Sequence, residues 1–114
     1  MQTETRNEVL LVGRLSLPAQ ERVLPSGDTL VQFRVVVDRP ETRRGDQPRR
    51  ATVDAIECAA WAPGVRRSVS SWAAGDVVEV EGSLRRRFWR APGAGLGSRY
   101  EVDVVRARRV SRAA

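Results

Sequence analysis

The chain has 114 residues, a formal net charge of +6 at pH 7, 41% hydrophobic residues, one cysteine and no histidine. This length accommodates one compact core and leaves no room for a second, and the composition argues against wholesale disorder. Without histidine the chain lacks the commonest general base and the commonest zinc ligand. We therefore expect neither an enzyme nor a metal or other cofactor.

All 20 basic residues are arginine, set against 14 acidic residues. Guanidinium groups bind phosphate bidentately and stack on bases, so this charge predicts a polyanionic partner. A compositional bias of the genome is an alternative reason for the missing lysine, but it does not explain the net charge. No segment approaches the ~18 apolar residues of a membrane-spanning helix, so we expect a cytoplasmic, nucleoid-associated protein.

The first third of the chain predicts a flexible N-terminus followed by two strands. Residues 1–6 are polar, and the apolar run from Asn7 to Leu17 predicts a strand that bends at Gly13. Residues 25–28, Pro-Ser-Gly-Asp, are placed to turn the chain into a hairpin. The second strand follows, with Gln32 and Arg34 on its outer face. Its inward residues are Val31, Phe33, Val35 and Val37.

The middle of the chain predicts a basic loop, a third strand and one helix. Asp38 to Arg50 contains no apolar residue and is expected to be a long, exposed loop. In the third strand, about Thr52 to Trp61, the inward residues are Ile56, Cys58 and Ala60, and the outward ones are Ala55, Glu57, Ala59 and Trp61. Pro63 can open a helix that Gly75 ends. Its apolar stripe is Val65, Val69 and Trp72, which predicts a core position for Trp72.

The last third predicts two more strands around a flexible loop at residues 92–97. In the fourth strand the inward set is Val78, Val80, Gly82 and Leu84, and the outward set is Glu79, Glu81, Ser83, Arg85, Arg87 and Trp89. The fifth strand turns Tyr100, Val102 and Val104 inward. Five strands with one short helix between the third and fourth predict an all-β, five-stranded OB-fold barrel. We assign it to residues 7–110, with 111–114 as a short C-terminal end.

Four fragments in this order resemble the bacterial single-stranded DNA-binding protein (SSB) family. They are NEVLLVGRL, PSGDTLVQFRV, GDVVEVEGSLRRRFW and SRYEVDV, and the resemblance covers Asn7 to Arg109. It implies an OB-fold, a homo-oligomer, usually a homotetramer, and binding of single strands by base stacking on exposed aromatic rings. Trp61 and Trp89 occupy two of the usual stacking positions.

The chain departs from the family pattern at several positions. Glu41 and Ala55 stand where aromatic residues are common, and Glu57 stands where a basic residue is often found. These departures imply weaker or differently routed binding. The chain ends at Ser111-Arg112-Ala113-Ala114, so it resembles a short paralogue without the acidic tail that recruits repair proteins.

The candidate site is nucleic-acid-binding, and each residue has a structural alternative. Trp61 and Trp89 stack bases, or they pack against the helix, the loops or a neighbouring subunit. Arg85 and Arg87 share the face of Trp89 and contact phosphates, or they pair with Glu79 and Glu81. The complete set is Trp61, Trp89, Arg85, Arg87, Arg34, Arg22, Arg43, Arg44, Arg49 and Arg50.

The expected function is sequence-independent binding of single-stranded DNA in replication, recombination or repair. One alternative is an OB-fold interaction or assembly module with weak nucleic-acid binding, which fits the missing aromatic residues. Another is RNA as the ligand, because stacking platforms alone do not detect a 2′-hydroxyl group.

Overall fold

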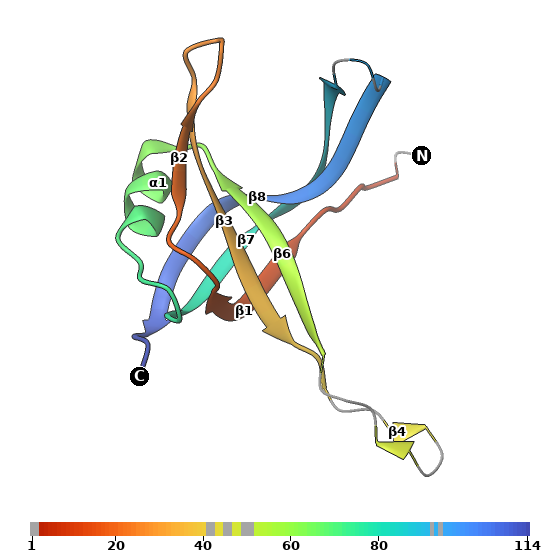
Figure 1. Cartoon of the computed structure of the whole chain (residues 1–114), viewed down its shortest axis with the longest axis vertical. Coiled ribbons are helices and arrows are strands. Elements are labelled where there is room, and N and C mark those ends of the chain that lie inside the picture. The colour runs from red at the N-terminus through yellow and green to blue at the C-terminus, as the bar shows by residue number, and fades with distance from the viewer. Residues whose placement is uncertain (1–2, 41–42, 45–46, 49–51, 92, 94) are drawn as a thin grey trace.

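The computed structural model describes residues 3–40, 43–44, 47–48, 52–91, 93 and 95–114, with the side chains of 43, 44, 47, 48 and 91 left out (Figure 1). The main elements, in chain order, are β1 (Val9–Leu15), β2 (Gln20–Val23), β3 (Thr29–Asp38), β6 (Val53–Ala60), α1 (Pro63–Ser70), β7 (Val77–Ala91) and β8 (Gly95–Ser111). Two short strands, β4 (Arg43–Arg44) and β5 (Gln47–Pro48), form a separate small sheet.

Five strands close into a ring, as the sequence predicts for an OB-fold barrel. The order in the sheet is β1-β7-β8-β6-β3, and β1 pairs again with β3 through Arg14 and Leu15 to complete the circuit. All neighbours are antiparallel except β6 and β8, which run parallel. The helix lies between β6 and β7 in the chain, as expected, and β2 is an additional strand at the outer edge of β3.

The alternation of side chains places one apolar set inside the ring. Val31, Phe33 and Val35 on β3 are buried, while Arg34 between them is exposed. The hairpin turn before β3 is confirmed, and Gly27 takes a positive φ of 91° there, which suits a residue without a Cβ. The remaining core members are Leu15, Cys58, Ala60, Val69, Trp72, Val78, Val80, Val102 and Val104.

The helix closes one end of the barrel, but it is shorter than the sequence predicts. Pro63 occupies the first turn and Val69 is buried, yet the helix ends at Ser70, and Gly75 lies in the turn that leads into β7. The Asp76 side chain accepts a hydrogen bond from the Ala73 amide at 2.9 Å, which stabilises that turn. Within the residues described, no helix is long and apolar enough to cross a membrane.

Trp72 lies in the core, as expected. It follows the helix, is 6% exposed, and meets the ring of Phe33 edge to face with 5.8 Å between the centroids. This arrangement is one that aromatic pairs favour.

The β7–β8 hairpin extends beyond the barrel as an arm (Figure 1), which we define as residues 84–91 of β7 and 95–100 of β8. The expected loop at 92–97 is wrong in extent, because Trp89 pairs with Gly97 and β8 already begins at Gly95. The inward orientation expected of Leu84 and Tyr100 also fails to bury them, since they are 44% and 59% exposed. The arm projects past the core, so the described part of the barrel leaves these two side chains uncovered.

A bulge separates the arm from the barrel part of the hairpin. Glu81 pairs with Arg106 but Gly82 pairs with Val104, so β8 has one extra residue at this point. A Cβ on Gly82 would lie 1.9 Å from the carbonyl oxygen of Asp103. The close approach of the two backbones therefore requires glycine.

Candidate nucleic-acid interface

A groove opens on the outer face of the barrel, between the β2–β3 hairpin and the arm. Its volume is about 560 Å³. Three segments that are far apart in the sequence form its walls: the hairpin, the end of β6, and both strands of the arm. The lining residues are Arg22, Leu24, Leu30, Gln32, Trp61, Arg87, Phe88, Trp89, Arg99 and Glu101.

Trp61 forms the barrel side of the groove. It follows the last residue of β6 and is half-buried. The guanidinium carbon of Arg87 lies 4.7 Å from the centroid of its ring, a cation–π contact. The indole Nε1 is buried and has no hydrogen-bond partner among the described residues. The ring is thus held at the groove with one polar group unsatisfied.

Trp89 forms the arm side of the groove and is 46% exposed. It packs on Gly97, its partner across the hairpin, where a Cβ would lie 2.5 Å from the indole Cε2. The guanidinium carbon of Arg99 lies 5.9 Å from the ring centroid. The missing side chain at Gly97 therefore gives the indole its place on the arm.

Glu101 links the two cation–ring pairs. Its carboxylate is only 2% exposed, and its Oε1 accepts a hydrogen bond from Nε of Arg87 while its Oε2 lies 3.9 Å from Arg99. A buried carboxylate is tolerable when it is paired in this way. Each arginine consequently contacts a tryptophan ring and one shared carboxylate, so Glu101 joins the two cation–ring pairs.

The floor and far wall come from the β2–β3 hairpin and the middle of the sheet. Arg22 donates a hydrogen bond to the side-chain oxygen of Gln32 at 3.1 Å. Leu30 is only 3% exposed although it shares the outer face with Gln32. Ala59, predicted to point outward, is nevertheless fully buried, because its single methyl group lies between the longer side chains of Gln32 and Asp103 on the neighbouring strands.

Two predicted arginines share this face but do not line the groove. The Nε of Arg34 donates to Glu57 at 2.6 Å, and Arg85 lies 3.9 Å from Asp103. The acidic residue noted at position 57 thus neutralises a predicted phosphate contact.

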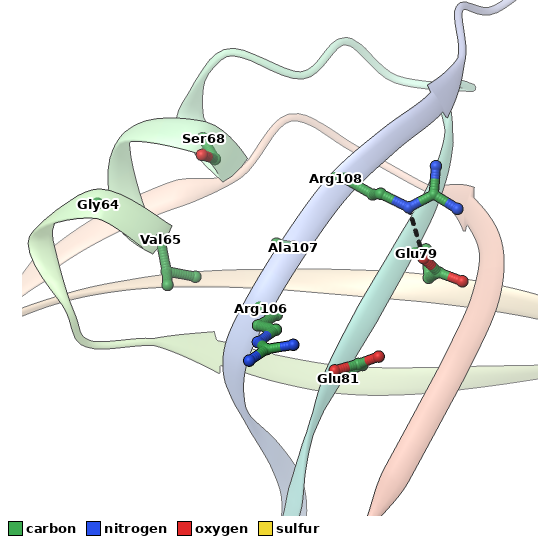
Figure 2. A pocket seen from close by; sticks show the side chains of 8 residues that line it. All are labelled: Gly64, Val65, Ser68, Glu79, Glu81, Arg106, Ala107 and Arg108. Carbon is green, nitrogen blue, oxygen red and sulfur yellow. Dashed lines mark hydrogen bonds and ion pairs between the residues drawn. The ribbon is translucent and has the colours of Figure 1, made fainter.

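The alternative that paired Arg85 and Arg87 with Glu79 and Glu81 is wrong. Residues four apart on one strand are separated by ~13 Å, whereas residues opposite each other on adjacent strands lie ~5 Å apart. The real partners are therefore on β8. Glu79 instead pairs with Nε of Arg108 at 2.6 Å, in a second hollow under α1 that Glu81 also lines (Figure 2).

The predicted basic loop is only partly described. Arg49 and Arg50 lie outside the described residues, as does Glu41. Arg43 and Arg44 form β4, which pairs with β5, so the loop contains a short hairpin that its lack of apolar residues did not suggest.

Four of the ten predicted residues thus line one groove: Trp61, Trp89, Arg87 and Arg22. Sequence reasoning missed Arg99, Glu101 and Gly97. The signal for them is the hairpin register, because Arg87 pairs with Arg99 and Trp89 with Gly97. That register could be read only if β8 was recognised as beginning at Gly95.

The chain matches known proteins over nearly its whole length. Residues 6–111 match the model of the single-strand binding protein (SSB) family. A single-stranded DNA-binding protein of Oceanobacillus iheyensis is 30% identical over 99 residues, which are 87% of this chain and 58% of the relative. The chain thus spans somewhat over half of that relative's length.

A solved structure, described as Plasmodium falciparum SSB complex with ssDNA, matches with a TM-score of 0.81 and 17% identity, over 97% of this chain and 100% of the other. At that identity the likeness establishes the fold alone, and it supports the OB-fold assignment. With the family match covering the barrel and the arm together, the chain belongs to the single-strand binding protein family.

Proposed function

We propose that the chain binds single-stranded DNA with little sequence preference, through the groove between Trp61 and Trp89, and that it is not an enzyme. The observation that carries this proposal is the pairing of each ring with a guanidinium group on opposite sides of one groove. Base stacking on such rings contributes ~1–3 kcal/mol per base and tolerates any sequence, because every base has a π face. Duplex DNA keeps its bases stacked inside, so it cannot use the rings.

The arginines supply the electrostatic part of the proposed binding. Arg22, Arg87 and Arg99 line the groove together with one carboxylate, Glu101. Contacts from such groups to phosphate position the strand without reading its sequence. A protein that binds single-stranded DNA would act in replication, recombination or repair. Its place of action would be the nucleoid in the cytoplasm, where single strands are exposed.

We also propose that the chain forms a homo-oligomer, with a tetramer as the expected state. Leu10 and Val12 on β1 point away from the core and are 61% and 49% exposed. Within the described residues, Val9–Gly13 pair with β7 on one edge only. A second copy would cover both the apolar side chains and the unpaired strand edge. Light scattering should give a mass above that of the monomer at micromolar concentration, and a monomer would contradict this part of the proposal.

A second candidate function is an interaction or assembly module with weak nucleic-acid binding. The favouring observation is that three carboxylates on this face of the sheet, Glu57, Glu101 and Asp103, pair with Arg34, Arg87 and Arg85, of which only Arg87 lines the groove. RNA is a further candidate ligand, since the groove geometry alone does not distinguish the two sugars.

Titration of three labelled ligands at two salt concentrations tests these functions. The ligands are oligo-dT, oligo-rU and duplex DNA, measured by fluorescence anisotropy. We expect oligo-dT to bind tightly with a strong salt dependence and duplex DNA to bind weakly. Preferential binding of oligo-rU would assign the groove to RNA. No binding of either single strand would refute the proposal and favour the interaction module.

A further inference from the structure

The arm presents a second set of aromatic and basic side chains on the face opposite Arg87 and Trp89. Side chains alternate along a strand, so Arg86 and Phe88 on β7 point away from their neighbours Arg87 and Trp89. Phe88 is 63% exposed. We name this surface the reverse face; it consists of Leu84, Arg86 and Phe88 on β7 and Ser98 and Tyr100 on β8.

Arg86 is held between the two aromatic rings of this face. Its guanidinium carbon lies 5.1 Å from the ring centroid of Phe88 and 5.4 Å from that of Tyr100. One of its terminal nitrogens donates a hydrogen bond to the Ser98 hydroxyl at 3.1 Å. Three neighbouring side chains therefore fix an exposed arginine that free rotation would otherwise disorder.

The charge of Arg86 is not neutralised by the described part of the chain. Among the residues described, no carboxylate lies within 4.0 Å of it, whereas Arg87 and Arg85 on the groove side have Glu101 and Asp103 as partners. A fixed, unneutralised cation between two exposed rings is complementary to a phosphate flanked by unpaired bases. An apolar protein partner would instead have to bury this charge without compensation.

We propose that the reverse face is a second subsite for the same single strand, which crosses the arm beside Phe88 and stacks bases on Phe88 and Tyr100. This inference rests on the proposed function of the groove. Phe88 also borders the groove, so the two surfaces adjoin at the rim of the arm. Short strands fill the groove alone, and longer strands reach both faces.

The inference predicts that the reverse face matters only for long strands. The variant Tyr100→Ala removes an exposed ring that does not line the groove, and Arg86→Gln removes the charge. Both are compared with wild type in anisotropy titrations against oligo-dT of increasing length at fixed salt. We expect an unchanged Kd for the shortest strand that binds and a loss of about tenfold or more for long strands. Val105→Ala, which shortens another outward side chain, is the matched control, since Val105 is 64% exposed.

Three results would overturn the inference. One is an equal loss for short and long strands, which makes these residues part of the groove. Another is no loss at any length. The third is a changed mass of free Tyr100→Ala or Arg86→Gln in light scattering, which makes the reverse face a subunit interface. A wild-type chain that binds no oligonucleotide of any length would refute the proposed function itself, and the subsite with it.

Discussion

Replacing Trp89 with alanine should weaken DNA binding while leaving the barrel folded. The ring is 46% exposed and is supported by Gly97 and Arg99 on the arm. Losing one stacking platform costs ~1–3 kcal/mol, which corresponds to an increase in Kd of about 5- to 140-fold at ~1.4 kcal/mol per factor of ten.

The cost to stability is bounded by the buried half of the ring. A fully buried tryptophan removes ~150–250 Å² from water, so about half of it, at ~25 cal/mol per Å², gives ~2–3 kcal/mol, with ~3 kcal/mol as the upper limit. This area belongs to the arm, and Trp89 is not a member of the buried core, so its loss should affect the hairpin more than the barrel. Trp72→Ala is the opposite case, because Trp72 is 6% exposed and packs on Phe33. We expect a loss of ~3–5 kcal/mol and a Tm lower by more than ~10 °C.

Both variants are measured by anisotropy with labelled oligo-dT and by calorimetric melting. Gly97→Ala is the matched control that displaces the indole of Trp89 without deleting it, and it should give an intermediate loss of affinity. Equal drops in Tm for Trp72→Ala and Trp89→Ala would refute the assignment of faces. An unchanged Kd for Trp89→Ala would refute the role of the groove.

Three further predictions concern charge, pH and thiol reactivity. Neutralising Arg85 and Arg87 together should weaken binding to all sequences alike. If both contact phosphate, the slope of log affinity against log salt should flatten by up to about 1.4. Arg108→Gln is the control, because it breaks an ion pair away from the groove and should leave that slope unchanged. The backbone amides of Ala73 and Ala113 donate hydrogen bonds to Asp76 and lower the pKa of its carboxyl group. The ionised Asp76 therefore stabilises the fold fully above the unfolded-state pKa of about 3.9, and this stabilisation is lost as the pH falls through the folded-state pKa. The difference in Tm between wild type and Asp76→Asn should therefore be largest near neutral pH and shrink towards pH 3, and a difference independent of pH would contradict this. Burial raises the pKa of the Cys58 thiol to about 12, so a thiol reagent at pH 8 should label it only in denaturant, and rapid labelling of the native chain would contradict its place in the core.

The barrel was predictable because alternation and core burial coincide within it. Val31, Phe33, Val78 and Val80 face inward as expected, and Trp72 closes the end of the core. The same alternation continues into the arm, where it still assigns sides but no longer predicts burial. Leu84 shares a face of β7 with the buried Val78 and Val80 but is exposed, because in the arm no core side chains pack against that face.

The sequence predicted the candidate site only at residues whose type alone suggests a role, such as an outward-facing tryptophan. Trp61 and Trp89 are conspicuous in the sequence, but their partners Arg99 and Glu101 depend on the register of a hairpin whose second strand begins in a glycine-rich segment. A glycine-rich segment reads as a loop, and the cross-strand neighbours are then lost. Without the register, the sequence offered only Glu79 and Glu81, on the same strand, as partners for Arg85 and Arg87. The carboxylates that pair with these arginines lie across the hairpin on β8.

The bulge at Gly82 has a geometric consequence for the spacing of the two indoles. Trp61 is attached to the barrel and Trp89 to the arm, and the arm joins the barrel where β7 and β8 shift register. The inclination of the arm at this joint therefore sets the distance between the two indole rings. Substitution of Gly82 by a larger residue would force the two backbones apart beside Asp103, and the distance between the indoles of Trp61 and Trp89 would change although neither ring is itself altered.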